Sequence, residues 1–406
     1  MPNLHLKHTP QIGGTIQKLP ASKSISNRAL ILNALSGNRS TVSNLATARD
    51  TQLMKSLLAN PEKTIDAMDA GTTMRFLTAY YAITGQNKVL TGTPRMKERP
   101  IGLLVKALRE IGADINYLEK EEFPPHEVKG FISQKTSEIS LPGNVSSQYI
   151  SALMMIAPIL PEGLTINLEG KVGSWPYIEM TAALMASFGG RFFMKNGKIV
   201  ILPGQYVPTS ITVEPDWSAL SYWYAIVALA EKSSITLSDV LPYSVQGDRV
   251  IVEIMEQLGV NTRFENGNAI LNKTDLINTH LEWDFTDCPD LAQTVLPVCA
   301  MKEVRGTFTG LESLYIKETD RIAALQNELS KVGAQLVETS KGIFTLTPGK
   351  ISSEKIKINT YHDHRMAMGF APLATLMDVE IEAPEVVNKS YPEFWDDLRA
   401  IGFDMK

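Results

Sequence analysis

The sequence predicts an α/β protein made of two halves, each built from three related repeats. The length of 406 residues is sufficient for two domains of about 200 residues each. An apolar helix followed by a polar turn and a short strand recurs along the chain. Its six copies are RALILNALSGNRSTVSNL, RFLTAYYAITGQNKVLTGTP, ISALMMIAPILPEGLTINLEG, SYWYAIVALAEKSSITLSDV, QTVLPVCAMKEVRGTFTGLES and RMAMGFAPLATLMDVEIEAPE. These helices are apolar on most sides, so we expect them to be buried.

A second helix in most repeats ends at a glycine, which is a typical helix stop signal. The pattern occurs in LREIGADI, LMASFGGRF, MEQLGVNTRF, LSKVGAQL and LRAIGFDM. The glycines at positions 112, 189, 259, 333 and 402 recur at intervals of about 70 to 77 residues. This period is longer than that of solenoid repeats, so each unit is large enough to form a small α/β layer.

The first repeat is short, because no second helix, glycine and strand follow LMKSLLANPEKTIDAM before DAGTTMR. We expect one domain of residues 20–212, with three repeats of which the first is truncated. The other domain is expected to contain residues 1–19 and 213–406, and residues 1–19 are expected to form a strand of it. The chain would then cross near Pro20 and Thr212, which would make a hinge, and active sites often lie between hinged domains.

The composition is that of a globular protein, with 44% hydrophobic and 20% charged residues. The net charge of −5 argues against nucleic-acid binding, although it allows a local cationic pocket. Two cysteines are too few for a disulfide framework. The start of the sequence shows no apolar h-region of a signal peptide, and the longest apolar stretches are broken by Pro or Gly well short of a membrane span. We therefore expect a cytoplasmic protein with no membrane partner.

The stretch KETDRIAALQNELSKVGA places four charges at the start of an amphipathic helix: Lys317, Glu318, Asp320 and Arg321. Taken alone, it is typical of a solvated helix start in which Glu318 and Arg321 form an ion pair.

The stretch LPASKSISNRALILNAL predicts a helix that begins near Lys23, with Ser22 as its N-cap. Ser24 and Arg28 share one face of this helix. A helix N-terminus with two cations and a hydroxyl is suited to a phosphate or carboxylate. The alternative is a solvated first turn.

Other predicted helices also begin with polar or cationic residues. Gly71 opens one helix in DAGTTMRFL, and Arg95, Lys97 and Arg99 precede a helix expected to begin at Pro100. Further helix starts carry Ser146, Ser147, Gln148, Ser174, Tyr177, His364, Arg365 and Lys389, with Asp363 as a candidate N-cap. If these starts converge, they form a cleft for a small molecule with several negative charges.

Four residues have competing interpretations. His362 and His364 form an H-x-H pair, but no other metal-ligand cluster is present, so a metal site is disfavoured. Cys288 is either a nucleophile or, as we favour, an inert thiol at a helix edge. Asp290 is either an acid favoured by the helix dipole or a general base in a cleft.

Nine segments, spread in order over residues 23–394, resemble one family, the 5-enolpyruvylshikimate-3-phosphate synthases. They are KSISNRA, DAGTTMR, PRMKERPI, VSSQY, PYIEMT, PDLAQT, KETDRI, DHRMAM and KSYPEF. The resemblance implies a two-domain inverted α/β barrel of six βαβαββ-type repeats, with helices inside and sheets outside. It also implies transfer of the enolpyruvyl group of phosphoenolpyruvate to the 5-hydroxyl of shikimate 3-phosphate, by addition and elimination in an interdomain cleft. No metal or organic cofactor is implied, and we expect a monomer.

The resemblance also implies roles for individual residues. Asp290 would be the base near the 5-hydroxyl, and Glu318 would donate a proton to C3 of phosphoenolpyruvate, with Lys23 nearby. The implied phosphoenolpyruvate site consists of Lys23, Gly71, Arg99, Gln148, Arg321, His364, Arg365 and Lys389. The implied shikimate 3-phosphate site consists of Lys23, Ser24, Arg28, Ser146, Ser147, Gln148, Ser174, Tyr177, Asp290 and Lys317.

The sequence departs from the family pattern in two places. The first repeat is truncated between about Leu58 and Met68, and Asp69 stands where the family motif has Asn. An ionised Asp69 cannot donate a hydrogen bond to an anion. Its carboxylate either turns away and pairs with a cation such as Arg75, or faces the phosphoenolpyruvate site and weakens binding.

Three other functions remain in competition at this point. The sister enzyme acting on UDP-N-acetylglucosamine has a reactive Cys or Asp on a mobile loop, and residues 85–99 contain no such loop. A relative of RNA-phosphate cyclases is disfavoured by the acidic composition and by the lack of a nucleotide-binding motif. A non-catalytic anion binder is disfavoured by the presence of both Asp290 and Glu318.

Overall fold

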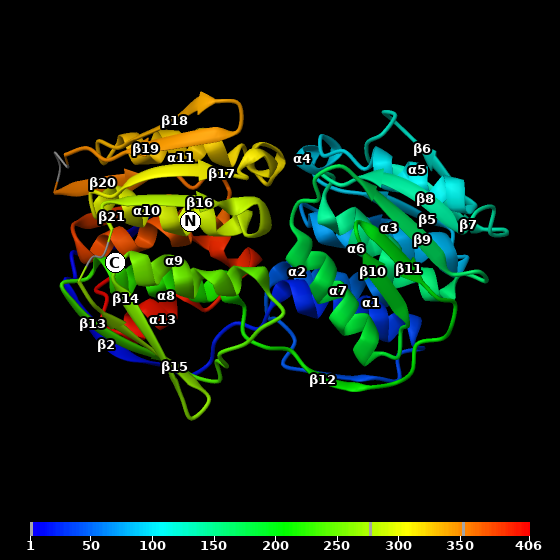
Figure 1. The fold of residues 1–406 in the computed structure, drawn as a ribbon, viewed down its shortest axis with the longest axis horizontal. Helices are drawn as coiled ribbons and strands as arrows, with labels where there is room; N and C mark the ends of the chain where they lie inside the picture. Colours follow the sequence, from blue (N-terminus) through cyan, green and yellow to red (C-terminus); the bar gives the residue numbers. More distant parts are fainter. Residues whose placement is uncertain (1–2, 276–277, 351–353) are drawn as a thin grey trace. The chain divides into compact units, whose positions relative to one another are not determined.

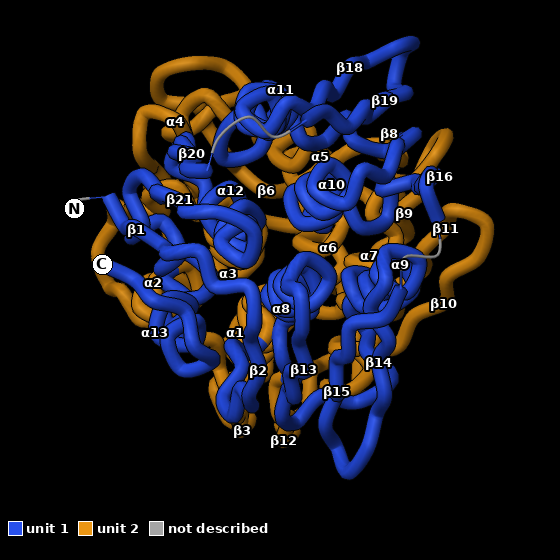
Figure 2. The backbone as a smooth tube through the Cα atoms, turned by 90° about the vertical axis from the view of Figure 1, so that its left-hand side faces the viewer, with its two compact units in different colours: residues 1–21, 47–49, 214–406 blue, residues 22–46, 50–213 orange. Residues whose placement is uncertain are grey.

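The structure is a computed structural model that describes residues 3–275, 278–350 and 354–406 (Figure 1). Backbone contacts divide the chain into two units, coloured separately in Figure 2. Unit 1 contains residues 1–21, 47–49 and 214–406, and unit 2 contains residues 22–46 and 50–213. The expected boundaries, after residues 19 and 212, lie close to two of these divisions. That each unit moves as an independent domain stays a prediction.

Unit 2 contains two four-stranded sheets and one two-stranded sheet. The four-stranded sheets have the orders β4-β5-β7-β6 and β8-β9-β11-β10, and in each the first two strands are parallel and the last two antiparallel. The two-stranded sheet pairs β3 with β12 in parallel. The strands are β3 (Thr41–Ser43), β4 (Thr64–Asp66), β5 (Lys88–Thr91), β6 (Ala113–Tyr117), β7 (His126–Phe131), β8 (Glu138–Pro142), β9 (Leu164–Glu169), β10 (Phe192–Lys195), β11 (Lys198–Ile201) and β12 (Ser210–Thr212).

The helices of unit 2 are of two kinds. The first helix of each repeat is buried, as in α1, where every residue from Ile25 to Leu32 is buried. The second helix is amphipathic: α5 buries Leu104, Leu108 and Ile111 at helical spacing and exposes Lys106. The helices are α1 (Lys23–Leu35), α2 (Arg49–Leu58), α3 (Gly71–Thr84), α4 (Pro94–Lys97), α5 (Gly102–Ile111), α6 (Ser147–Ile156) and α7 (Trp175–Ser187).

Unit 1 contains sheets with the orders β2-β13-β15-β14, β16-β17-β19-β18 and β1-β21-β20. The expectation of one strand in residues 1–19 was wrong, because the segment forms two strands in different sheets. β2 pairs with β13 in parallel, and β1 pairs with β21 in antiparallel fashion. The strands are β1 (Leu4–Leu6), β2 (Gln11–Ile16), β13 (Lys232–Leu237), β14 (Val260–Glu265), β15 (Asn268–Lys273), β16 (His280–Asp284), β17 (Arg305–Thr309), β18 (Gln335–Ser340), β19 (Ile343–Thr347), β20 (Lys355–Ile358) and β21 (Asp378–Ile381).

The core of unit 1 is formed by α8, α10 and α12, which lie together with the sheets around them (Figure 2). Burial of apolar side chains in these helices contributes about 1.5–3 kcal/mol for each large residue. Gly369 lets α12 approach α10, because a Cβ atom there would lie 2.2 Å from the carbonyl oxygen of Gln293. The helices are α8 (Trp217–Leu229), α9 (Ile251–Gln257), α10 (Ala292–Met301), α11 (Arg321–Ser330), α12 (His364–Phe370) and α13 (Phe394–Ala400).

The six predicted repeats correspond to the six sheets. The first repeat is truncated as predicted, since β4, the strand that follows α2, belongs to the next sheet. The last repeat is completed by β1 from the other end of the chain. The five predicted helix-end glycines all have positive φ, from 79° to 129°, a conformation that glycine adopts readily.

Candidate active site

Arg321 is the centre of a charged cluster in unit 1. This first residue of α11 is only 1% exposed, and its guanidinium group contacts three carboxylates. Its Nε donates to Oδ2 of Asp363 (2.7 Å), its Nη1 to Oδ1 of Asp290 (2.8 Å) and its Nη2 to Oε2 of Glu318 (3.0 Å). Such charge-assisted hydrogen bonds are the strong ones in proteins, so the cluster fixes the relative positions of three acids.

Helix capping explains why these side chains meet. Asp320 is the N-cap of α11 and accepts a hydrogen bond from the backbone of Ala323, so Arg321 lies at the first helical position. Asp363 is the N-cap of α12, as predicted, and accepts from the backbone of Arg365. Lys317 and Glu318 therefore precede the helix and lie in a loop.

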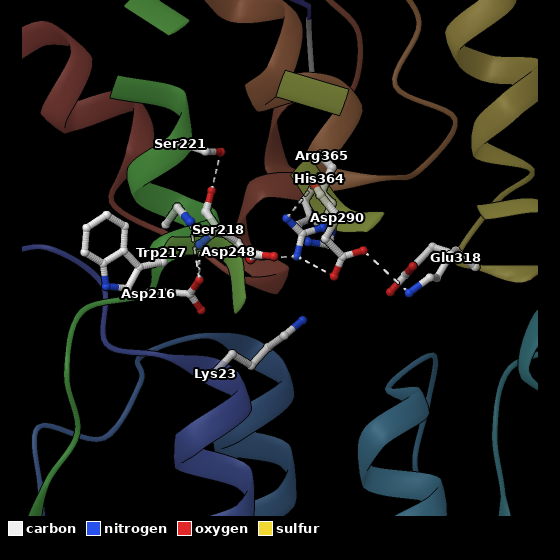
Figure 3. Close-up of polar contacts among 12 residues, drawn as sticks. Lys23, Asp216, Trp217, Ser218, Ser221, Asp248, Asp290, Glu318, His364 and Arg365 are labelled. Atoms are coloured by element: carbon white, nitrogen blue, oxygen red, sulfur yellow. Dashed lines mark hydrogen bonds and ion pairs between the residues drawn. The ribbon is translucent and has the colours of Figure 1, made fainter. Parts of the chain in front are cut away.

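Three further cations contact the same acids. Nη2 of Arg365 donates to Oδ2 of Asp290 (3.0 Å), and Nζ of Lys317 lies 3.5 Å from Oδ1 of that residue. Nζ of Lys389 lies 3.6 Å from Oε1 of Glu318. Asp290 and Glu318 thus each have at least two cationic partners, and Figure 3 shows the two acids next to each other.

The charges of the cluster shift the pKa values of its members. Burial by itself raises the pKa of Asp290, but Arg365, Lys317 and Arg321 together hold that pKa well below its usual range. Burial lowers the pKa of Arg321, and the surrounding Asp363, Glu318 and Asp290 raise it above its usual value by a larger amount. Asp290 is therefore ionised at neutral pH and is a weak base as long as these cations hold it.

A second layer of polar groups lies behind Arg365. Its Nη2 also donates to the hydroxyl of Ser218 (3.3 Å), in the first turn of α8. That hydroxyl makes a short hydrogen bond with the carboxyl group of Asp248, which is only 4% exposed (Figure 3). The segment Gly247–Val250 is a 3-10 turn that leads into α9.

In unit 2, Arg28 is a buried cation with uncharged partners. Its Nε donates to the hydroxyl of Thr181 (2.7 Å), and its Nη2 donates to the hydroxyl of Ser151 (2.9 Å). Its Nη1 donates to the carbonyl of Ser24, one turn earlier. Burial lowers the pKa of Arg28 to about 10. Within the described part of the chain no carboxylate pairs with Arg28, so an anionic ligand would supply the missing countercharge.

Lys23 and Asp50 form an ion pair at the start of α1. Nζ of Lys23 lies 3.2 Å from Oδ2 of Asp50, which is only 4% exposed. Ser22 caps this helix as predicted, since its hydroxyl accepts from the backbone of Ile25. The predicted helix start at Lys23 is confirmed.

Gly71, at the start of α3, lies against two guanidinium groups. A Cβ atom at this position would be 2.5 Å from Nη1 of Arg75 and 2.7 Å from Nη2 of Arg99. Both arginines are buried, and Nη1 of Arg99 donates to the backbone carbonyl of Asp69 (3.4 Å). The side chain of Gln148 joins this group through Thr72, to whose hydroxyl its amide nitrogen donates (3.0 Å).

The remaining predicted residues of unit 2 lie at helix starts. Ser146 is the N-cap of α6, and Ser147 is its first residue. Ser174 precedes α7 with a φ of 55°, a left-handed conformation that is uncommon outside glycine, and its hydroxyl does not cap the helix. Cζ of Arg28 lies 5.8 Å from the centre of the Tyr177 ring. The expected helix start at Pro100 was wrong, because α4 takes up Pro94–Lys97 and α5 begins at Gly102.

The geometry does not support Cys288 as a nucleophile or His364 as a metal ligand. Cys288 is 3% exposed, and burial raises the pKa of its thiol far above the usual value, so it is a poor nucleophile. His364 is buried, with Nδ1 3.5 Å from the carboxylate of Asp363. In residues 3–275, 278–350 and 354–406, no group of three or more His, Cys, Asp or Glu side chains is arranged to hold a metal ion.

Comparison with known proteins gives the family. The model of the family described as EPSP synthase (3-phosphoshikimate 1-carboxyvinyltransferase) matches residues 6–61 and 54–398. A protein of Bacteroides fragilis (strain YCH46), named 3-phosphoshikimate 1-carboxyvinyltransferase, is 47% identical over 399 residues, which cover 98% of this chain and 97% of that protein. The chain belongs to the EPSP synthase family. A protein of the same name from Sodalis glossinidius (strain morsitans) is 35% identical over 437 residues, covering 98% and 97% of the two chains.

The fold is also that of the EPSP synthase family. The solved structure of EPSP synthase from Acinetobacter baumannii matches with a TM-score of 0.78 over 100% of both chains, at 20% identity. The predicted fold class, an α/β architecture of two domains with helices inside and sheets outside, is confirmed. No helix in the described ranges has both the length and the apolar composition needed to cross a membrane.

For this member of the EPSP synthase family, the structure brings together most of the site residues predicted in unit 1. Asp290, Lys317, Glu318, Arg321, Arg365 and Lys389 form one cluster with Asp363. In unit 2, Arg28 lies with Ser24 and Tyr177, and Gly71 lies with Arg99. Sequence reasoning missed Asp248 and Ser218, and also the pairing of Lys23 with Asp50. The only sequence signal for Asp248 is its place before the second helix of its repeat, where other repeats carry predicted site residues.

Proposed function

We propose that this chain transfers the enolpyruvyl group of phosphoenolpyruvate to the 5-hydroxyl of shikimate 3-phosphate and releases inorganic phosphate. The family assignment supports the reaction, which belongs to the shikimate pathway of aromatic amino acid biosynthesis. The observation that supports it best in the structure is the pair of acids, Asp290 and Glu318, held on one guanidinium group. An addition–elimination reaction needs one group that accepts a proton and one that donates a proton, close to cations that bind anionic substrates.

In the addition step, Asp290 accepts the proton of the 5-hydroxyl while the oxygen of that hydroxyl attacks C2 of phosphoenolpyruvate. Glu318 donates a proton to C3, which becomes a methyl group, and a tetrahedral adduct forms. In the elimination step, the methyl group loses a proton to the carboxylate of Glu318, the C2–C3 double bond forms again, and the C2–O bond to phosphate breaks. The departing phosphate takes up the proton that Asp290 accepted, which returns both acids to their starting states. Lys23 is assigned the role of balancing the charge of the departing phosphate.

The contacts in unit 1 suggest how substrates activate these acids. Without a substrate, Arg321 and Arg365 are engaged by carboxylates, which keeps the pKa of Asp290 low. The phosphate and carboxylate groups of phosphoenolpyruvate compete for the same guanidinium groups. As these cations turn to the substrate, Asp290 loses the partners that hold its pKa low, so it becomes able to accept a proton near neutral pH.

Substrate binding is proposed to involve both units. The cations assigned to phosphoenolpyruvate come from unit 1 and unit 2 and are Lys23, Arg99, Arg321, Arg365 and Lys389. Gly71, Gln148 and His364 are assigned to the lining of its site. Shikimate 3-phosphate is held by Lys23, Ser24, Arg28, Ser146, Ser147, Gln148, Ser174 and Lys317, with Tyr177 against its ring. The uncharged surroundings of Arg28 support this assignment, because a ligand anion would complete them.

We propose further that the chain works as a monomer in the cytoplasm, without a metal or an organic cofactor. Both substrates are phosphorylated and do not cross membranes unaided, so the enzyme is expected where they are made. The molecular mass in solution tests the monomer, and activity after treatment with a chelator tests metal independence.

The direct test is release of phosphate from phosphoenolpyruvate by the purified protein. Release is expected only when shikimate 3-phosphate is also present, and in equal amount to the enolpyruvyl product. Replacement of shikimate 3-phosphate by UDP-N-acetylglucosamine is expected to give no release. Release without any acceptor, or no release with both substrates, would contradict the proposed function.

A further inference from the structure

Asp248 occupies a position at which other repeats carry residues that are proposed to bind substrate. It lies just before α9, the second helix of the fourth repeat. The corresponding positions of other repeats carry Arg99, Ser174, the Lys317–Arg321 stretch and Lys389. Asp248 has no role in the reaction as proposed above.

Only one of the two carboxyl oxygens of Asp248 has a hydrogen-bond partner among the described residues. One carboxyl oxygen makes the short hydrogen bond with the hydroxyl of Ser218, and the other, Oδ1, is buried with no hydrogen-bond partner in the described part of the chain. Helix capping does not account for this arrangement, because Asp216 already accepts from the backbone of Ser218 as N-cap of α8. A buried carboxyl group with an unsatisfied oxygen costs stability, so it needs another explanation.

Ser218 connects Asp248 to the acid–base cluster. Its oxygen accepts from Nη2 of Arg365 (3.3 Å), and the same Nη2 donates to Oδ2 of Asp290 (3.0 Å) (Figure 3). The guanidinium of Arg365 is thus held from one side by Asp290 and from the other by the Asp248–Ser218 pair. Nη1 of Arg365 faces the hydroxyl of Tyr222 at 3.5 Å.

We propose that Asp248 is a positioning residue that acts through Ser218 to orient Arg365 and to set how strongly Arg365 attracts the anionic groups of phosphoenolpyruvate. This proposal rests on the proposed function, in which Arg365 binds that substrate. The relay works in both protonation states: a protonated Asp248 donates to Ser218, and an ionised Asp248 accepts from it. In each case the oxygen of Ser218 keeps a lone pair for Arg365.

The charge of Asp248 changes within the working pH range. Burial, and next the nearby charge of Asp290, raise the pKa of Asp248 to about 7. The charged and titratable groups that face it are Asp216 before α8, Asp290 and Cys288 before α10, and Arg365 on α12. Above this pH, an ionised Asp248 adds a negative charge behind Arg365, which weakens the attraction for an anionic substrate.

The test compares the wild type with Asp248→Asn, which mimics the protonated state at every pH. The KM for phosphoenolpyruvate of the two proteins should agree near about pH 6, and the wild-type KM should be about fivefold higher near about pH 8.5, as expected for one charge at a partly screened distance. The ratio of the two KM values at one pH removes the titration of the substrate itself. The kcat values should differ much less.

Two further variants separate positioning from structural effects. Asp248→Ala removes the relay as well as the charge, so its KM should be about tenfold higher than that of Asp248→Asn at both pH values. Asp248→Asn should keep, at both pH values, the low KM that the wild type has near about pH 6. Asp397→Asn is the matched control, because Asp397 is an aspartate on α13 whose pKa is also raised by burial and which also accepts from a hydroxyl, that of Tyr391. The KM of this control should equal that of the wild type at both pH values.

A KM ratio between wild type and Asp248→Asn that stays constant with pH would overturn the proposal. If Asp248→Ala does not fold, the pH dependence of Asp248→Asn decides alone. The dissociation constant of inorganic phosphate, measured without turnover, should show the same pH-dependent ratio. If the wild type is inactive but the ratio of the phosphate dissociation constants depends on pH as expected, the proposed function is refuted and the effect of Asp248 on anion binding stands. If the wild type is active and this ratio does not depend on pH, the proposed function stands and the inference is refuted.

Discussion

At the scale of single residues, the charged cluster around Arg321 has a large desolvation cost that its ion pairs must offset. Removing charged groups from water costs several kcal/mol for each ion, and their mutual attraction repays this only with good geometry. One guanidinium group satisfies three carboxylates here, and two of them, Asp290 and Glu318, are partly accessible. The ion pairs therefore stabilise the cluster without a ligand, and its proposed role requires that substrate anions displace some of these carboxylates.

Residues of the charged cluster were predictable from the sequence where a motif carried them, as with Lys317, Glu318 and Arg321 in KETDR. The proposed role of Asp248 was not predictable, because it depends on Ser218, which lies 30 residues earlier in the chain, and on Arg365 in a later repeat. The partners of Arg28, Ser151 and Thr181, also come from other repeats and have no signal of their own.

The raised pKa of Asp248 predicts a pH-dependent stability. The pKa is about 7 in the folded protein and about 3.9 in an unfolded chain, so between these values the folded state binds more protons. The stability due to this proton is fully present below about pH 4 and is lost as the pH rises through about 7. Asp248→Asn lacks this loss, so it should gain stability relative to wild type between about pH 5 and pH 8, by at most about 4 kcal/mol. Denaturant unfolding at the two pH values measures this gain, and an equal difference at both would refute the assigned pKa.

At the scale of helices and strands, the sequence predicted the helices better than the sheets. The apolar first helices, the N-caps Ser22 and Asp363, and the five glycines after second helices were all predicted and confirmed. The two strands before Pro20 were read as one, because a strand of three residues such as Leu4–Leu6 has too few positions to show an alternating pattern. The short helix Pro94–Lys97 was missed for the same reason of length.

Gly71 gives a prediction at the start of α3. In Gly71→Ala, the new methyl group would push against the guanidinium ends of Arg75 and Arg99, which are flexible and can move. The KM for phosphoenolpyruvate should therefore rise several-fold, while the melting temperature stays within about 3 °C of wild type. Gly204→Ala is the control, since its Cβ atom would meet nothing within 4 Å. A large loss of stability in Gly71→Ala, or an unchanged KM, would contradict the proposed place of Gly71 in the site.

At the scale of the whole molecule, the repeats of both units carry residues that are proposed to bind substrate. First helices carry Lys23, Gly71, Ser147, Asp290 and Arg365 at or near their starts, and second helices carry Arg99, Ser174, Arg321 and Lys389. The sequence could predict this common location, because the start of each helix is marked by caps and charges. The spacing in KETDR predicted the ion pair of Glu318 with Arg321, which the structure shows. The sequence could not predict that Asp290 and Asp363 share the same cation, since that depends on how the repeats pack within a unit.

The two units are predicted to approach each other when substrate binds. Each unit carries cations assigned to the same anionic substrates, so an anion is expected to bridge them and to overcome their repulsion. Small-angle X-ray scattering should show a smaller radius of gyration with saturating shikimate 3-phosphate than without it. Arg28→Ala should not show this change at the same ligand concentration. An unchanged radius for the wild type would argue against closure.

The central claim is that Asp290 and Glu318 are the acid–base pair of the reaction. The most direct measurement is steady-state release of phosphate from phosphoenolpyruvate with shikimate 3-phosphate, for the wild type, Asp290→Asn and Glu318→Gln. Each substitution keeps the shape of the side chain and removes its ability to exchange a proton, so kcat should fall by roughly 10² or more, with much smaller changes in both KM values. A kcat close to that of the wild type in either variant would contradict the account.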